Sequence, residues 1–164
     1  MILPKAIYVC SNPSPSHVKT LDGLEGIISV FNDGTPLSVQ SARVVAQGYN
    51  CPNRTFPGLC HEDVYEDHFD SHEQFLEFCR RVKGLSVANA IKKEPAAVAA
   101  RSAIKTSLLA IAKELPRVGS AVVFCSDYYL ELAAPLSQNI CLGESGAGLK
   151  YSVMWDKICR VDLI

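Results

Sequence analysis

Residues 94–132 read EPAAVAARSAIKTSLLAIAKELPRVGSAVVFCSDYYLEL, and this stretch decides the fold class. Apolar side chains recur at helical spacing over residues 98–112, and Pro95 suits a first helical turn, so we predict one long helix. A proline and a glycine end it. Residues 121–125 form a short apolar run typical of a central β-strand, and Asp127 follows it. The order of helix, strand and second helix predicts an α/β protein with Asp127 at the carboxyl end of a strand, where such sheets keep their chemistry.

The composition predicts one globular domain spanning residues 1–164. The chain has a net charge of −1, with 20% charged and 48% hydrophobic residues. It therefore lacks the excess of basic residues that is typical of a nucleic-acid-binding surface. No apolar run reaches membrane-spanning length and no signal-peptide pattern opens the chain, so we expect no membrane association. Seven scattered cysteines indicate thiols in a reducing compartment, the cytoplasm or the nucleus. The glycosylation pattern at Asn53 leaves secretion, after removal of a signal, as the alternative.

The sequence pattern predicts β-strands in the amino-terminal part of the chain. Residues 6–10 form a short apolar run before a loop rich in Ser and Pro. Two further runs, 26–31 and 41–49, flank the turn signal Asn-Asp-Gly at 32–34. Residues 41–49 also satisfy helical spacing, but the adjacent Val44 and Val45 and the nearby Gly48 favour a strand. We therefore expect a three-stranded antiparallel meander.

Residues 51–92 are expected to be an insertion between the third strand and the long helix. They begin with a loop rich in Pro, Gly, His and acidic residues, and Ser71 then caps a helix ending near residue 82. Two histidines one helical turn apart are able to share a metal, which raises the alternative of a structural zinc site. The simpler interpretation is a solvated acidic loop. The zinc ligands would be Cys51, Cys60, His61, His68 and His72.

This order of elements resembles the ribonuclease H-like fold, an antiparallel meander followed by a helix and a parallel strand. Residues 7–11 resemble the family's first strand, Ile-Tyr-Thr-Asp-Gly, and residues 26–49 resemble its second and third strands. Residues 99–108 resemble its helix pattern Ala-Glu-x-x-Ala-x-x-x-x-Leu. Residues 124–129 resemble its Thr-Asp-Ser-x-Tyr, and residues 149–163 its Asn-x-x-Leu-Trp-x-x-Leu. The resemblance covers most of the chain outside the insertion.

The resemblance implies a lost active site. Enzymes of that family hydrolyse phosphodiesters with two divalent cations held by clustered carboxylates. The family's first aspartate falls on Cys10, the helix glutamate on Ala100 and the second aspartate on Asp127, so one acid remains. We therefore expect a pseudoenzyme that acts by binding RNA or a protein partner. The alternative is an active ribonuclease, using Mg²⁺ or Mn²⁺ on RNA or an RNA/DNA hybrid, with a rearranged acid set.

Other residues enter these hypotheses. A rearranged acid set would draw on Asp22, Glu25, Asp156 or Asp162. A separate alternative, an unrelated α/β domain with a cysteine-based site, would use Cys10 or Cys125, although both lie in apolar strands where core thiols are expected. A sheet edge left open by a missing last strand would favour a dimer. The candidate RNA contacts are Ser11, Asn12, Lys19, Arg101 and, by stacking, Tyr128.

Overall fold

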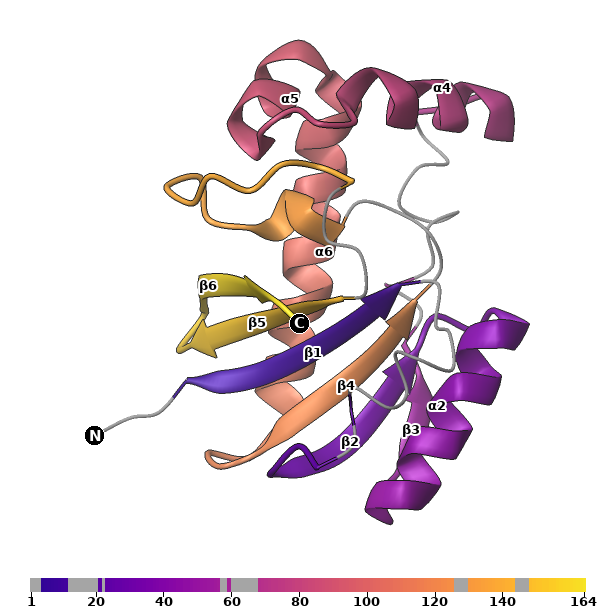
Figure 1. The fold of residues 1–164 in the computed structure, drawn as a ribbon, viewed down its shortest axis with the longest axis vertical. Helices are drawn as coiled ribbons and strands as arrows, with labels where there is room; N and C mark the ends of the chain where they lie inside the picture. The colour runs from indigo at the N-terminus through magenta and orange to yellow at the C-terminus, as the bar shows by residue number, and fades with distance from the viewer. Residues whose placement is uncertain are drawn as a thin grey trace.

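The structure is a computed structural model that describes residues 4–11, 21, 23–56, 59, 68–125, 130–143 and 148–164. These residues form one sheet with flanking helices (Figure 1). The strands are β1 (Lys5–Ser11), β2 (Ile27–Asn32), β3 (Asn53–Thr55), β4 (Ser120–Cys125), β5 (Leu149–Met154) and β6 (Lys157–Leu163). The helices are α2 (Pro36–Tyr49), α4 (His72–Val82), α5 (Val87–Lys93), α6 (Pro95–Glu114) and the 3₁₀ helix η2 (Leu130–Ala133).

The strands form a mixed six-stranded sheet in the order β3-β2-β4-β1-β5-β6. The first four strands in this order are parallel to one another. Strand β5 runs antiparallel to β1, and β6 runs antiparallel to β5. The chain leaves β1, passes over β4 to reach β2, and returns to β4 only after α6. Strand order therefore reverses around β4, the position where open α/β sheets form a crevice at the carboxyl ends of their strands.

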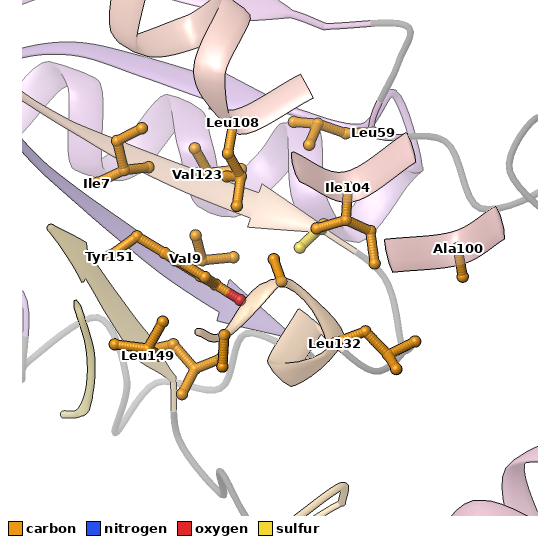
Figure 2. Close-up of a cluster of buried hydrophobic side chains, with 14 of the residues drawn as sticks. Ile7, Val9, Leu59, Ala100, Ile104, Leu108, Val123, Leu132, Leu149 and Tyr151 are labelled. Atoms are coloured by element: carbon orange, nitrogen blue, oxygen red, sulfur yellow. The ribbon is translucent and has the colours of Figure 1, made fainter. Parts of the chain in front are cut away.

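Helices cover the two faces of the sheet, with α2 on one side and α6 on the other (Figure 1). Residues Ala42 and Val45 of α2 pack in one apolar cluster with Val122 and Phe124 of β4. The alternate residues of β4 pack with α6 in a larger cluster, where Ile104 and Leu108 face the sheet (Figure 2). Because both faces are covered, β4 reads as a continuous apolar run, as the sequence predicted.

The predicted antiparallel meander is wrong. Residues 36–49 form helix α2, and β2 pairs in parallel with β4 and β3. The turn signal at Asn32–Gly34 joins a strand to a helix here, with Gly34 at φ 86°. Pro36 occupies the first helical positions, where its missing N–H costs nothing, and the apolar stripe of α2 packs on β4. That packing outweighs the modest strand preference of two adjacent valines.

Other elements agree with the sequence. Strands β1, β2 and β4 and helices α4 and α6 lie within one or two residues of their predicted ranges, and Ser71 caps α4 by accepting a hydrogen bond from the Gln74 N–H. The segment 51–92, predicted as an insertion, contributes β3 to the sheet, and Phe78 and Val82 of α4 to the core. Within the described ranges, no helix is long and apolar enough to cross a membrane.

Candidate functional site

The carboxyl ends of three parallel strands meet at one edge of the sheet. Ser11 of β1 lies opposite Cys125 of β4, and Asn32 of β2 lies opposite Phe124 on the other side. The carboxyl ends of β1, β2 and β4 therefore lie side by side. We call the side of the sheet where these strands end the carboxyl edge, which is distinct from the edge strands β3 and β6. We take it as the candidate site because the strand order reverses around β4.

Two buried polar residues at the end of β2 shape one side of the carboxyl edge. Asn32 is 2% exposed, and its Oδ1 accepts hydrogen bonds from the Gly34 N–H at 2.9 Å and the Thr55 hydroxyl at 3.0 Å. Asp33 is 4% exposed, and its Oδ1 accepts from the N–H and the hydroxyl of Thr35 at 3.0 and 2.7 Å. The Asp33 N–H donates to the Phe124 carbonyl at 3.1 Å. These bonds hold the turn into α2 against the end of β4 and give both side chains a structural role.

A buried acid on η2, the element that follows β4 in the described chain, affects the pKa of a buried tyrosine. Glu131 is 2% exposed, and Tyr151 of β5 is fully buried. Burial raises the pKa of Tyr151 well above its ordinary value, the charges of Glu131 and Cys125 raise it further, and Arg101 opposes them. The phenol therefore stays protonated at neutral pH and is no general base.

Arg101 anchors η2 to α6. Its Nη1 donates to the carbonyl oxygens of Leu132 at 2.5 Å and Ala134 at 2.6 Å. Partial burial of this guanidinium lowers its pKa from the ordinary value. Since Arg101 is directed at the backbone of η2, its observed contacts are structural, whereas the sequence suggested a contact to RNA.

The two strand cysteines are core residues. Cys10 and Cys125 are 1% and 0% exposed, and the Cys125 thiol lies 3.8 Å from the Cys10 carbonyl oxygen. Burial raises the pKa of Cys10 to about 12, so its thiolate is scarce at neutral pH. A nucleophilic cysteine reacts as the thiolate, and Cys10 therefore does not suit that role.

The acid positions implied by the ribonuclease H resemblance are apolar. Ala100, on the buried face of α6, is 0% exposed, and Cys10 is equally enclosed. Asp127 follows β4 but lies outside the described residues, as do Asp22, Asn12, Lys19 and Tyr128, and the side chain of Ser11 is also not described.

The remaining candidate acids lie elsewhere. Glu25 precedes β2 and so lies at the amino edge of the sheet. Asp156 lies in the turn after β5, whose last residues pair with the first residues of β1, again at the amino edge. Asp162 forms an ion pair with Arg160 on β6. None of these three described acids follows the carboxyl end of β4.

The zinc hypothesis stays a prediction. Cys60, His61 and the side chain of His72 lie outside the described residues. Of the other two ligands, Cys51 follows α2 and packs partly against the α2 cluster, and His68 is exposed before α4. Among the described residues, no group of three or more His, Cys, Asp or Glu side chains lies close enough to hold a metal ion.

Sequence reasoning missed the buried polar residues of the carboxyl edge. Asn32 and Asp33 were interpreted as a hairpin turn, although Thr35-Pro36 after them is a helix-start signal that points to a strand–helix turn. Glu131 carries no local signal, because its burial depends on tertiary packing and η2 packs against α6, which is distant in sequence.

Comparisons with known proteins relate this chain to a fold and to no family. No family model matches the sequence, and no curated protein matches it significantly. Among solved structures, YhfR of Bacillus stearothermophilus is similar over 93% of both chains, with a TM-score of 0.53 and 11% sequence identity. At that identity the similarity concerns the fold alone: an α/β arrangement with a mixed six-stranded sheet and flanking helices.

Proposed function

We propose that this domain works by binding a protein partner at the carboxyl edge and not by two-metal hydrolysis. The observation that carries the proposal is the enclosure of Cys10 and Ala100, the two positions where the resemblance implies carboxylates, in the apolar core at 1% and 0% exposure. Paired dications need several oxygen ligands close together. Of the three positions that the resemblance implies, Asp127 alone keeps a carboxylate, and the described residues contain no group of three or more His, Cys, Asp or Glu side chains that could hold a metal ion.

The ribonuclease H relationship itself stays a prediction, and the strand order counts against it. A meander places the first three strands antiparallel to each other, whereas β2 pairs in parallel with β3 and β4. The binding proposal does not depend on that relationship. It requires only a carboxyl edge without a cluster of carboxylates.

A protein partner is favoured over RNA by charge and by exposed apolar surface. The chain carries a net charge of −1, and Arg101 donates to backbone carbonyls. RNA binding draws most of its affinity from unengaged basic side chains. Leu37, in the first turn of α2 at the carboxyl edge, is 54% exposed, and Val44, two turns further on, is 53% exposed. Residues seven apart share a helix face, so Leu37 and Val44 are presented on the same side of α2, with the polar Gln40 and Ser41 between them. Exposed apolar side chains flanked by polar ones suit contact with a protein surface.

Photo-crosslinking tests where the partner binds. A benzoylphenylalanine replaces Leu37 or, as the matched control, Val118, an 84% exposed residue before the amino end of β4. We expect a discrete protein adduct through position 37 that Val44→Asp abolishes, and none through position 118. Equal adducts at both positions, or an RNA adduct at position 37, would refute the proposal.

A metal titration tests the alternative of an active nuclease. Calorimetry with Mn²⁺ is compared between the wild-type protein and Asp127→Asn, alongside cleavage of RNA and of an RNA/DNA hybrid. We expect no saturable binding in the micromolar range and no cleavage. Micromolar binding that Asp127→Asn abolishes, together with cleavage by the wild-type protein, would establish the nuclease instead.

A further inference from the structure

Strand β6 ends the sheet, and its outer backbone faces away from β5. An edge strand presents N–H and C=O groups that are able to pair with another strand, so proteins usually cover or interrupt such edges. The opposite edge is a strand of only three residues, Asn53–Thr55. With seven residues, β6 is the edge long enough for strand addition.

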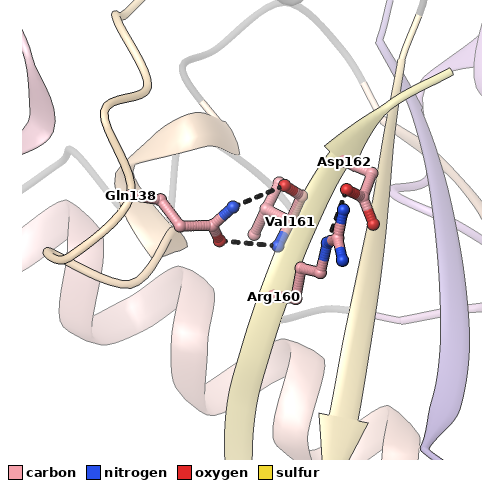
Figure 3. A network of polar contacts seen from close by, with 4 residues as sticks. All are labelled: Gln138, Arg160, Val161 and Asp162. Atoms are coloured by element: carbon pink, nitrogen blue, oxygen red, sulfur yellow. Dashed lines mark hydrogen bonds and ion pairs between the residues drawn. The ribbon is translucent and has the colours of Figure 1, made fainter.

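The side chain of Gln138 lies on the outer edge of β6. The Gln138 Nε2 donates to the Val161 carbonyl at 3.0 Å, and the Val161 N–H donates to the Gln138 Oε1 at 2.8 Å (Figure 3). In an antiparallel sheet, two directly opposed residues exchange the same pair of hydrogen bonds. The amide of Gln138 therefore takes the place that one residue of a neighbouring strand would take.

The sequence around Val161 is complementary to itself. In an antiparallel pairing of two copies centred on Val161, each Arg160 lies opposite Asp162 of the second copy. Within one chain these two side chains already pair, with the Arg160 Nε 2.7 Å from the Asp162 Oδ1. They lie on one face of the sheet, since β-strand residues two apart share a face. Two-fold pairing would give two opposite-charge cross-strand pairs and no like-charge pair at these positions.

We propose that β6 is a self-pairing edge for a second copy of this chain and that the Gln138 amide blocks it. With Gln138 in place, Val161 has both of its outward hydrogen bonds satisfied within the chain, and the protein is a monomer. When the amide is removed, the same backbone groups pair with Val161 of the second copy. The contact is isologous, so it closes at a dimer.

Sedimentation equilibrium of the full chain tests the proposal. The wild-type protein and Ser137→Ala, a change at the exposed neighbour of Gln138, are expected to be monomers. Gln138→Ala and Gln138→Met are expected to dimerise. Circular dichroism reports whether each variant is folded, and Gln138→Met keeps the length of the side chain, so it serves if Gln138→Ala unfolds.

A charge swap identifies the pairing register. In the Gln138→Met background, Arg160→Asp places like charges opposite each other at both symmetry-related sites and is expected to weaken dimerisation roughly tenfold. Adding Asp162→Arg restores opposite charges and is expected to restore the dimer. A dimeric wild-type protein, a monomeric folded Gln138→Met, or a dimer that ignores both charge changes would each overturn the proposal.

Discussion

Replacing Arg101 by methionine would test whether this residue holds the carboxyl edge together or contacts RNA. The Nη1 donates to the carbonyls of Leu132 and Ala134, and these residues are 0% exposed. Methionine keeps the apolar stem of the side chain packed along α6 but removes both donors. The two carbonyl oxygens of the η2 segment then lose their partner in the protein.

The expected loss in the free energy of unfolding follows from the two hydrogen bonds that Arg101 donates. A hydrogen bond from a charged donor stabilises a protein by about 1.5–3 kcal/mol, and Arg101 is half-buried, so water compensates for part of the loss. We expect Arg101→Met to lower the free energy of unfolding by about 2–3 kcal/mol in total. For a chain of this size that corresponds to a fall in Tm of roughly 5–10 °C.

Urea unfolding followed by circular dichroism measures this change, with fluorescence anisotropy of a labelled single-stranded RNA as the second readout. Lys105→Met, one turn further along α6, is the matched control, because it removes a cation with no hydrogen bond comparable to those of Arg101 and should cost less than about 0.5 kcal/mol. A stability loss equal to that of the control, combined with weaker RNA binding by Arg101→Met alone, would show that the structural role is wrong.

Two further predictions use three substitutions: a pair of glycines that differ in the space around them, and one buried cysteine. Gly148→Ala should destabilise the protein by about 1–3 kcal/mol in urea unfolding, because the new Cβ would lie 2.7 Å from the backbone oxygen of Val9 in a central strand. Gly48→Ala, in α2 with no atom within 4 Å of the new Cβ, should instead stabilise by up to about 1 kcal/mol, and a loss at both glycines would contradict the reasoning. The third change is Cys10→Val: since burial raises the pKa of Cys10 from 9.0 to about 12, the thiol ionises earlier in the unfolded chain. Wild-type stability is therefore complete below pH 9 and falls as the pH rises toward 12, and Cys10→Val should lose less stability than the wild type between pH 7 and about pH 10.

The elements with a strong local pattern could be predicted from the sequence. Helix α6 carries a long apolar stripe between a proline start and a Pro–Gly stop, and β4 is an apolar run too short for a helix. Both patterns depend on residues close in sequence, and both elements are present as predicted. The buried face of α6 was predicted less exactly. The apolar stripe predicted over residues 98–112 begins with Val98, which is 49% exposed.

The order of the strands could not be predicted in the same way. It depends on the choice between strand and helix at residues 36–49, where the local preferences nearly balance. Placing a strand there produced an antiparallel meander. The observed helix instead makes the connection from β2 to β3 a parallel crossover, and β4 lies between β2 and β1. The position of β4 is a pairing between residues distant in sequence, for which the local pattern carries no signal.

Local sequence patterns were also insufficient to predict the contacts of single residues in the candidate site. The sequence located the carboxyl end of β4, because its apolar run ends at Cys125. It did not predict that Arg101 would bind the backbone of η2 or that Glu131 would be buried. Those facts depend on how η2 packs against α6, an association of residues about 30 positions apart in sequence.

The two edges of the sheet are protected by different physical means, and this difference bears on the oligomeric state. At the β3 edge, the strand is short, and Arg54 both forms an ion pair with Glu114 and lies 5.3 Å from the centre of the Phe31 ring. These contacts attach β3 to α6 and β2. Because β3 has only three residues, it offers few backbone groups for pairing with another strand. At the β6 edge the strand is long, and the side chain found on its outer backbone is that of Gln138. Removing one amide should therefore open β6 while β3 stays closed, so the association predicted for Gln138 variants stops at two chains and does not continue into a fibre.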